Sequence, residues 1–320
     1  MKHFRARVAA VGAAIGSLPM LRTSDETAVN GDALAEARAG IEECRAITKR
    51  YGTSFYFATQ FFPREVREGI YAIYAFARIP DEIVDDPNCS DHALATRRLE
   101  DWYAEFKQAY HQGSSSDSVL DAIVKQFHKY GIPEADCDAF IRSMFMDEEK
   151  FSYANYAELE DYMYGSASVI GLMVTRVVGY SSDEAFEYAK KLGNAFQLTN
   201  FLRDIREDYE NLGRVYMPED EMARFGLTRD DIAGRVFDER FERFMRFQIE
   251  RNREVYREAF PGIRMLHWRG RLAVKISYVL YKAILGEIER ANYNVYAGRV
   301  RTNRQQKIVL SLKALTGVYE

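Results

Sequence analysis

The sequence predicts an all-α protein built as a single helical domain. Apolar residues recur every three or four positions over most of the 320 residues, whereas strand-like alternation never lasts more than a few residues. Only 7 prolines and 20 glycines interrupt the chain, which is too few for a turn-rich β-sandwich. A hydrophobic content of 47% supplies a well-filled core and excludes wholesale disorder.

The first 35 residues differ from the rest and are expected to form a separate N-terminal tail. Basic residues between Lys2 and Arg7 precede an apolar stretch from Val8 to Leu21, which Arg22 closes. A membrane span needs about 20 residues, so this stretch is too short to cross a bilayer. It is either a targeting or membrane-contact segment or a flexible tail. Residues 36–320 are expected to form the domain.

The predicted helices follow in order, each with a local signal. The first consists mostly of strong helix formers and ends before Gly52, and the second starts at Pro63, which suits the first turn of a helix. Serine-rich residues 113–118 form a linker, and the small residues 165–171 lead into a later helix. The predicted helices are 34–51, 63–77, 92–111, 119–130, 133–150, 156–164, 172–178, 183–209, 238–260 and 272–290.

Charge and cysteine content limit the functional classes. The formal net charge of −4 argues against a nucleic-acid partner, because such proteins usually present a basic face. The three cysteines, Cys44, Cys89 and Cys137, form no CxxC pair, and an odd number leaves no complete disulfide framework. A reducing compartment is therefore expected, and the cytoplasm is the simplest one.

A first acidic segment follows an apolar helical run. Asp81 and Asp85 lie four residues apart, so a helix places both carboxylates on one face. Like charges at this spacing destabilise a helix by a few tenths of a kcal/mol, about 0.2–0.5 kcal/mol. Taken alone, the pair is either a functional site or a solvated acidic end of the helix.

A second polar segment makes the functional interpretation the stronger one. Asn200, Asp204 and Asp208 form an i, i+4, i+8 ladder on one helix face, and Gln197 lies one turn upstream. Such a column is unusual between Phe and Leu residues. Ligands that offer only oxygen suit a hard divalent cation, and Mg²⁺ often binds through one or two carboxylates plus substrate phosphates. Two such helices facing each other would hold metal ions that bridge a diphosphate.

Rival sites have weaker support. None of the five histidines follows a glutamate by three residues, so a di-iron carboxylate bundle is excluded, and the scattered Cys and His do not suit zinc. The chain has no GxGxxG motif and no P-loop, so no nucleotide cofactor is expected. Spacing alone leaves a Ser-His-Asp triad open, but no GxSxG elbow is present.

Over roughly residues 45–310 the chain resembles the squalene/phytoene synthase family of head-to-head prenyl synthases. The most specific block is Gln197-Leu-Thr-Asn200-Phe-Leu-Arg203-Asp204-x-x-x-Asp208 with Arg214-Val-Tyr216-Met-Pro218. The other matching segments are Ser54-Phe55, Tyr74-Ala-Phe-x-Arg78 before Asp81, Tyr162-x-Tyr164-Gly165, Tyr281, Asn292-Tyr293 and Arg299. One departure is Glu82, because Asp-Asp-x-x-Asp is the commoner form of the first motif.

The resemblance implies an isoprenoid-synthase helical bundle with a central cavity, in which two aspartate-rich motifs bind Mg²⁺ (or Mn²⁺) and two prenyl diphosphates. By position, the implied metal ligands are Asp81, Asp85, Asn200, Asp204 and Asp208. The implied catalytic residues are Asp81, Asp85, Asp204, Asp208, Tyr74 and Gln197. The implied substrate-binding residues are Phe55, Arg78, Tyr162, Arg203, Arg214, Tyr216, Tyr281 and Arg299.

The implied reaction joins two prenyl diphosphates through a cyclopropylcarbinyl diphosphate. Two geranylgeranyl diphosphates would give phytoene without NADPH, and farnesyl diphosphate would give squalene or dehydrosqualene. A cyclising terpene synthase and a non-catalytic assembly protein on the same scaffold remain alternatives. An aromatic content of 13% suits a dry cavity that stabilises carbocations, although most of these rings are expected in the core. The small residues 165–171 either leave room for a prenyl tail or allow close helix packing.

The implied partners are the prenyl diphosphates, a membrane surface bound peripherally and downstream isoprenoid enzymes. Organelle targeting by the N-terminal segment is the alternative to a cytoplasmic location.

Overall fold

A computed structural model describes the backbone of residues 26–86 and 91–316 and the side chains of residues 38–86 and 91–315. The chain divides into two compact units, residues 1–36 and 37–320, and the site described below lies wholly in the second. Residues 1–22, which carry the predicted targeting or membrane-contact segment, and Cys89 lie outside the described residues. Cys44 and Cys137 are buried free thiols.

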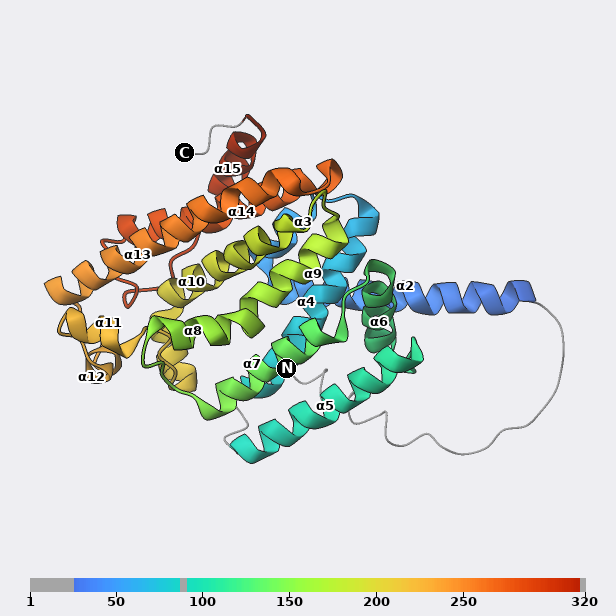
Figure 1. The fold of residues 1–320 in the computed structure, drawn as a ribbon, viewed down its shortest axis with the longest axis horizontal. Coiled ribbons are helices and arrows are strands. Elements are labelled where there is room, and N and C mark those ends of the chain that lie inside the picture. Colours follow the sequence, from blue (N-terminus) through green and yellow to red (C-terminus); the bar gives the residue numbers. More distant parts are fainter. Residues whose placement is uncertain (1–25, 87–90, 317–320) are drawn as a thin grey trace. The chain divides into compact units, whose positions relative to one another are not determined.

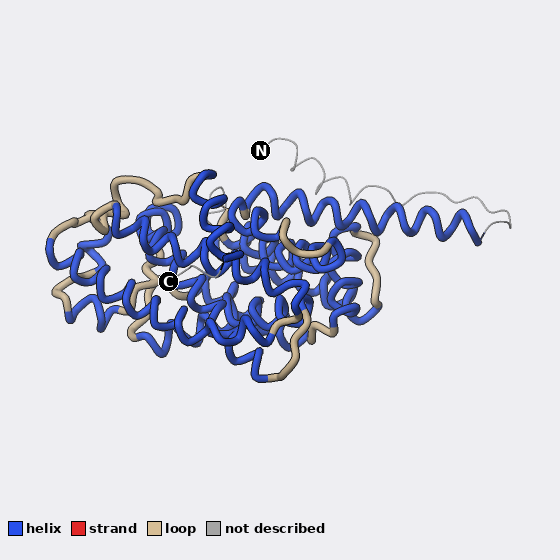
Figure 2. The backbone as a smooth tube through the Cα atoms, turned by 90° about the horizontal axis from the view of Figure 1, so that it is seen from above, coloured by secondary structure: helices blue, strands red, loops and turns tan. Residues whose placement is uncertain are grey.

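Within the described ranges the protein is helical and contains no strand (Figure 2). Its helices, which Figure 1 labels where there is room, are α2 (Glu26–Tyr51), α3 (Thr53–Thr59), α4 (Arg64–Val84), α5 (His92–Gln112), α6 (Ser118–Tyr130), α7 (Glu134–Glu149), α8 (Tyr156–Met163), the π-helix η1 (Tyr164–Ser168), α9 (Val169–Val178), α10 (Glu184–Leu212), α11 (Glu219–Arg224), α12 (Arg229–Ala233), α13 (Glu239–Ala259), the 3₁₀-helix η2 (Phe260–Met265), α14 (Trp268–Arg290) and α15 (Arg304–Thr316). None of these helices is long and apolar enough to cross a membrane.

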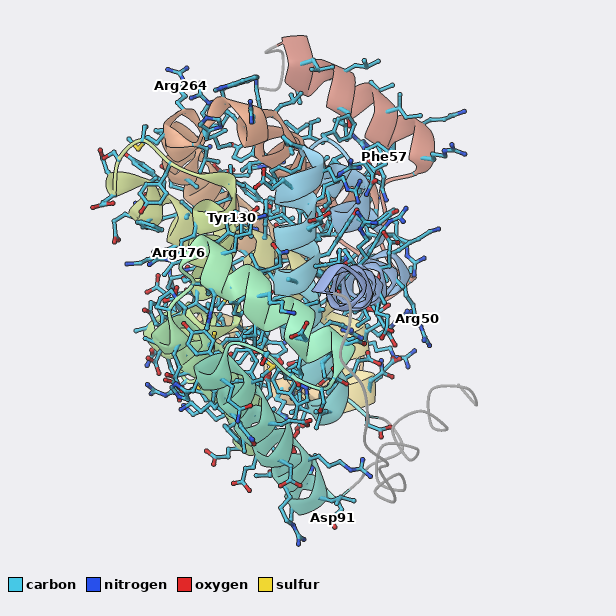
Figure 3. All side chains as sticks on the ribbon, turned by 90° about the vertical axis from the view of Figure 1, so that its right-hand side faces the viewer. Arg50, Phe57, Asp91, Tyr130, Arg176 and Arg264 are labelled. Carbon is cyan, nitrogen blue, oxygen red and sulfur yellow. The ribbon has the colours of Figure 1, made fainter. Side chains whose placement is uncertain are left out.

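Local sequence signals account for most helix ends. Asp91, labelled in Figure 3 at the start of α5, accepts hydrogen bonds from the N–H groups of Ala93 and Leu94 as an N-cap. Gly213 ends α10 with φ +65°, a conformation that glycine adopts without strain. Every predicted helix has a counterpart, and most ends agree within four residues, but α2 begins eight residues earlier than predicted and α4 ends seven residues later. The sequence analysis missed α3, α11, α12 and α15.

Helices α4 and α10 carry the two predicted acidic segments, and each packs against a largely different set of helices. Helix α10 packs against α9, η1, α13, α14 and η2, and α4 packs against α5, α6, α7 and α9 (Figure 1). The two helices therefore share α9 as a neighbour and leave a space between them. This arrangement brings the two predicted acidic segments to opposite walls of one cavity.

Aromatic residues fill much of the core, as predicted. The ring centroid of Phe76 on α4 lies 4.9 to 5.4 Å from those of Phe106, Phe127 and Phe140. All four rings are buried. Such pairs contribute about 0.5–1.5 kcal/mol each beyond the area that they bury. The cluster anchors the face of α4 that points away from the cavity.

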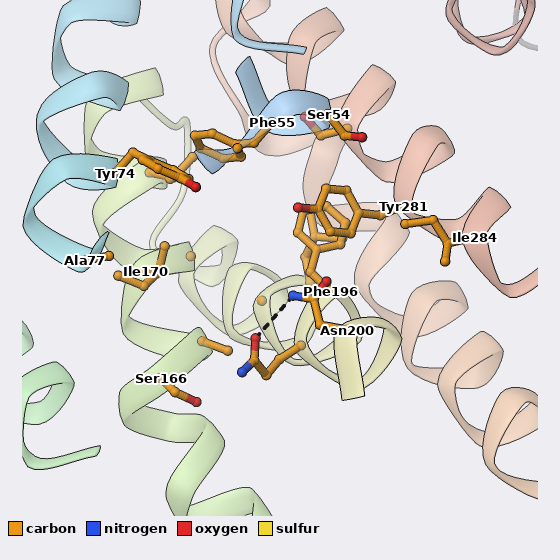
Figure 4. A pocket seen from close by; sticks show the side chains of 18 of the residues that line it. Ser54, Phe55, Tyr74, Ala77, Ser166, Ile170, Phe196, Asn200, Tyr281 and Ile284 are labelled. Carbon is orange, nitrogen blue, oxygen red and sulfur yellow. Dashed lines mark hydrogen bonds between the residues drawn. The ribbon is translucent and has the colours of Figure 1, made fainter. Parts of the chain in front are cut away.

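The small residues 165–171 serve close packing. A Cβ on Gly165 would lie 2.4 Å from the carbonyl oxygen of Ala139, and one on Gly171 would lie 2.4 Å from that of Ala189. Backbone therefore touches backbone here, which only glycine permits. Ser166 and Ile170 of the same stretch line the cavity, so the segment packs tightly on one side and borders open space on the other (Figure 4).

Candidate active site

A cavity of about 760 Å³ lies between α3, α4, η1, α9, α10 and α14. All of the site residues predicted from the sequence line it. They are Phe55, Tyr74, Arg78, Asp81, Asp85, Tyr162, Gln197, Asn200, Arg203, Asp204, Asp208, Arg214, Tyr216, Tyr281 and Arg299. Segments that are far apart in the sequence thus supply a single space, part of which Figure 4 shows.

The cavity changes from polar to apolar along α4. Asp81 and Asp85 lie at the C-terminal end of this helix, whereas Ile70 and Ile73 line the cavity from its N-terminal half. At 1.5 Å per residue, Ile70 and Asp81 are separated by about 16 Å along the helix axis. The arrangement suits a long apolar molecule with a charged end.

The first acidic segment is engaged by arginines. Arg78 pairs with both Asp81 and Glu82, and Arg214 lies 2.8 Å from Asp85. The backbone N–H of Asp85 donates to the carbonyl of Asp81, so Asp81 lies in the last turn of α4 and Asp85 is its C-cap, beyond the predicted end of the helix at residue 77. Glu82 is not among the residues that line the cavity. Arg78 and Arg214 are thus placed to exchange these carboxylates for another anion.

The second acidic segment follows one face of α10. The side-chain amide of Asn200 donates to Gln197 at 3.4 Å, the interaction dashed in Figure 4. Asp204 accepts hydrogen bonds from Arg203, with Nε at 2.8 Å, and from Arg299 at 3.1 and 3.0 Å. Arg299 comes from the segment after α14, so a distant part of the chain completes the acidic face.

The carboxylates repel one another in a poorly solvated space. Burial, together with the charge of Asp85, raises the pKa of Asp81 to about 7, against the opposing effect of Arg78. Burial and the charges of Asp204 and Asp85 raise the pKa of Asp208 well above its usual value. Additional positive charge would relieve this repulsion, which is what a divalent cation provides.

The donor set fits Mg²⁺ shared with a phosphate ligand. Within the described residues, no three Asp, Glu, His or Cys side chains converge as a closed metal cluster. The two acidic faces stand apart and offer carboxylate and amide oxygens, which matches the way Mg²⁺ is held by few protein ligands and by substrate phosphates. Arg78 Nε and Ser166 Oγ are buried without a hydrogen-bond partner in the described part of the chain. Both atoms could therefore form a hydrogen bond to a ligand in the cavity.

Asp147, at the end of α7, was missed by the sequence analysis. Its carboxylate is 4% exposed, lines the cavity and accepts hydrogen bonds at 2.9 Å from the hydroxyls of both Tyr162 and Tyr216. Arg214 Nε donates to its carbonyl oxygen at 3.1 Å. Burial raises its pKa to about 6, although Arg214 and the two tyrosines oppose the shift. Nothing in its sequence neighbourhood distinguishes it from a surface acid.

Stacked aromatic pairs line the cavity. The ring centroids are 5.2 Å apart for Phe55 and Tyr74, 4.5 Å for Phe196 and Tyr281, and 4.2 Å for Phe201 and Tyr216. Figure 4 shows the first two pairs on opposite walls. Ring faces attract cations by about 0.5–2 kcal/mol each without acting as nucleophiles, so these walls suit a cationic intermediate.

Further basic residues at the cavity also escaped prediction. Arg301 and Lys307 line it, as does Tyr51, whose ring lies 4.5 Å from the guanidinium carbon of Arg78. Lys307 belongs to α15, which the sequence pattern did not indicate. The cavity is therefore bordered by more positive charge than the motifs alone suggest.

Fold and site together define a class of protein, an all-α enzyme in which helices enclose an apolar cavity beside facing acidic and basic groups. The family model for squalene/phytoene synthase matches residues 48–306. The chain therefore belongs to the squalene/phytoene synthase family, whose members transfer prenyl groups.

Individual relatives agree with this membership. The chain is 34% identical over 288 residues to the 15-cis-phytoene synthase of Synechococcus elongatus, covering 86% of this chain and 92% of that protein. A dehydrosqualene synthase crystal structure shares the fold with a TM-score of 0.81 at 23% identity, covering 89% of this chain and 98% of the other. The squalene synthase HpnC from Alicyclobacillus acidocaldarius shares the fold with a TM-score of 0.73 at 26% identity, and the match covers 81% of this chain and 97% of HpnC. The predicted family, enzyme class and all-α isoprenoid-synthase fold are confirmed.

Proposed function

We propose that the protein condenses two geranylgeranyl diphosphates head to head into phytoene through a cyclopropylcarbinyl diphosphate. The observation that carries the proposal is the pair of acidic faces on α4 and α10 across one cavity with an apolar half. The similarity to phytoene synthases over most of the chain supports the C20 substrate.

The metal is proposed to lie between the two acidic faces. Its ligands would come from Asp81, Asp85, Asn200, Asp204 and Asp208. Bound Mg²⁺, or Mn²⁺ in its place, would supply positive charge to balance the diphosphate as it leaves. Arg78, Arg203, Arg214 and Arg299 now contact the aspartates, and they would turn to the diphosphate oxygens once the cation neutralises the carboxylates.

The remaining residues would orient and protect the reacting carbons. One prenyl diphosphate loses pyrophosphate, and the double bond of the second captures the allylic cation. Loss of a proton gives the cyclopropylcarbinyl diphosphate; a second ionisation, rearrangement and proton loss give phytoene. Tyr74, Phe55 and Tyr281 line this space with aromatic rings, and Tyr162, Tyr216 and Gln197 line it as well. The apolar walls exclude water, which would quench the cation.

A second candidate substrate is farnesyl diphosphate. The structural similarity to the squalene synthase HpnC, which is 26% identical to this chain, favours it. To decide, the protein is incubated with Mg²⁺ and either farnesyl or geranylgeranyl diphosphate, and the hydrocarbon is identified by mass. A C40 product supports the proposal, and a C30 product replaces it with squalene or dehydrosqualene synthesis. A cyclised product from one substrate would indicate a terpene synthase.

Turnover should not require NADPH. The sequence contains neither a GxGxxG motif nor a P-loop, so no nucleotide-binding loop is expected. Initial rates with and without NADPH should agree within about twofold in the same assay, a difference worth only about 0.4 kcal/mol in barrier. Strict dependence on NADPH would contradict the phytoene assignment and indicate squalene synthesis.

The protein is further proposed to work in the cytoplasm at a membrane surface, beside the enzymes that consume its product. Organelle targeting by residues 1–35 is the alternative. Removal of residues 1–22 should weaken binding to lipid vesicles, because the segment combines basic and apolar residues. Co-flotation of full-length and shortened protein measures this effect, and equal binding would exclude a role for the segment.

A further inference from the structure

Helix α15 turns a row of apolar side chains outward. Ile308, Val309, Leu312 and Leu315 are 46%, 51%, 56% and 54% exposed. The spacing i, i+1, i+4, i+7 places them on one side of the helix. They make up four of the eleven exposed large hydrophobic side chains in the described part of the protein, although α15 has only 13 residues. Single exposed apolar residues are ordinary, but a contiguous row marks an interaction surface.

The inward face of α15 is mixed, since Ala314 is fully buried and Leu310 packs on the core beside polar residues. Ser311 is 5% exposed and its hydroxyl donates to the carbonyl of Lys307 at 2.7 Å, and the side chain of Lys307 lines the cavity. Gln306 donates to Glu287 of α14 at 2.7 Å. A surface helix normally turns its apolar side inward and its polar side to water. Packing among the residues whose side chains are described therefore does not explain the outward row.

The charge around this row indicates what covers it. Residues 299–316 contain five basic and no acidic side chains, whereas the whole chain carries a net charge of −4. Arg304 and Lys313 are exposed on the helix that carries the row. At about 20 Å, α15 is too short to span a hydrocarbon core of about 30 Å. A short helix with apolar residues and flanking basic residues suits the plane of an anionic lipid surface.

The same segment borders the cavity. Arg299 to Thr302 and Lys307 line it, and α15 begins at Arg304 between them, at the outer edge of the unit (Figures 1 and 3). We propose that α15 lies in the interface of an anionic bilayer and places the adjoining part of the cavity against the lipid. The contact between α15 and lipid does not depend on the proposed function. Its purpose does: prenyl tails and a hydrocarbon product would pass between the cavity and the lipid without crossing water.

Full-length protein and the variant Ile308→Gln/Val309→Gln/Leu312→Gln test the proposal by co-flotation with vesicles. Vesicles of phosphatidylcholine with phosphatidylglycerol should retain the wild type better than phosphatidylcholine alone, and added salt should weaken the difference. The affinity of the triple variant for the mixed vesicles should be at least about tenfold lower than that of the wild type. A second variant, Arg304→Glu/Lys313→Glu, should lose the preference for the anionic lipid.

A matched control is Leu94→Gln/Phe237→Gln, which removes two exposed apolar side chains elsewhere on the surface. It should bind like the wild type. Unfolding temperatures of all variants check the fold, since the altered side chains are about half exposed. Turnover of detergent-dispersed substrate should be unchanged in the α15 variants, because none of these residues contacts the cavity.

Each remaining outcome is decisive. Equal vesicle binding by the wild type and the triple variant, or no binding by the wild type, overturns the proposal. A concentration-dependent dimer in light scattering that the triple variant abolishes, without lipid binding, would instead identify the face as an interface between two copies. Vesicle binding through α15 without any hydrocarbon product would retain this inference and refute the proposed function.

Discussion

Replacing Asp204 by alanine is expected to reduce turnover by about a thousandfold or more and to leave the fold intact. Asp204 lies in the middle of the acidic face of α10, and its side chain is 13% exposed between Arg203 and Arg299. Its loss removes a proposed metal ligand and frees two arginines that it now orients. Product formation with Mg²⁺ and geranylgeranyl diphosphate, alongside the helical circular dichroism signal, measures both parts of the expectation.

The matched control is Glu210→Ala on the same helix. Glu210 pairs with Arg235 and Arg206 and is not among the cavity-lining residues, so its loss should leave turnover unchanged and cost at most about 1 kcal/mol of stability. Pyrophosphate with Mg²⁺ should raise the unfolding temperature of the wild type and of this control, but not of Asp204→Ala. Wild-type rates in Asp204→Ala would refute the ligand assignment. A wild type without product or stabilisation would support the assembly-protein alternative.

The acidic ladder was predictable because helical spacing alone determines it. Asn200, Asp204 and Asp208 share a face of any helix, and so do Asp81 and Asp85, whatever packs around them. That the two faces oppose each other required the family resemblance, since no local rule says which helices become neighbours. The structure places both on the walls of one cavity.

The parts that sequence analysis missed depend on tertiary packing. Helix α3 is a seven-residue segment rich in Thr, Phe and Tyr, which have modest helix propensity, and its position against α14 stabilises it. Helix α15 was missed because its apolar residues do not form a single stripe: Leu310 and Ala314 lie on the inward side, opposite the outward row. Asp147 looks like any acid near a helix end, and only the approach of Tyr162 and Tyr216 from other segments gives it a role.

Asp147→Asn is expected to lower kcat by about a hundredfold while KM changes little. The hydroxyls of Tyr162 and Tyr216 both donate to Asp147, and burial keeps the pKa of both tyrosines well above the usual value, so both stay protonated. Both hydroxyl hydrogens therefore point to Asp147 and not into the cavity. An asparagine amide accepts from one tyrosine but must donate to the other, which turns one hydroxyl hydrogen toward the cavity. A hydrogen pointing at a carbocation disfavours it.

The stability of the same variant should change in the opposite direction to its activity. Because burial raises the pKa of Asp147 from 3.8 to about 6, the folded state disfavours its carboxylate. This penalty is absent below about pH 4, grows between pH 4 and 6, and reaches at most about 3 kcal/mol above that. Asparagine has no such penalty, so the variant should gain stability relative to the wild type as pH rises. Urea unfolding at pH 4.5 and 7.5 measures the change.

The control for Asp147 is its neighbour, Glu148→Gln. Glu148 is also buried, pairs with His92 at 2.7 Å, approaches Arg214 at 3.9 Å as Asp147 does, and is not among the cavity-lining residues. It therefore controls for the loss of a buried charge beside Arg214, and turnover should stay within about twofold of the wild type. Equal losses in both variants would mean that Asp147 acts only through the packing of α7. A rate loss confined to Asp147→Asn, in a protein at least as stable as the wild type at pH 7.5, would establish that the carboxylate acts by orienting the two tyrosines.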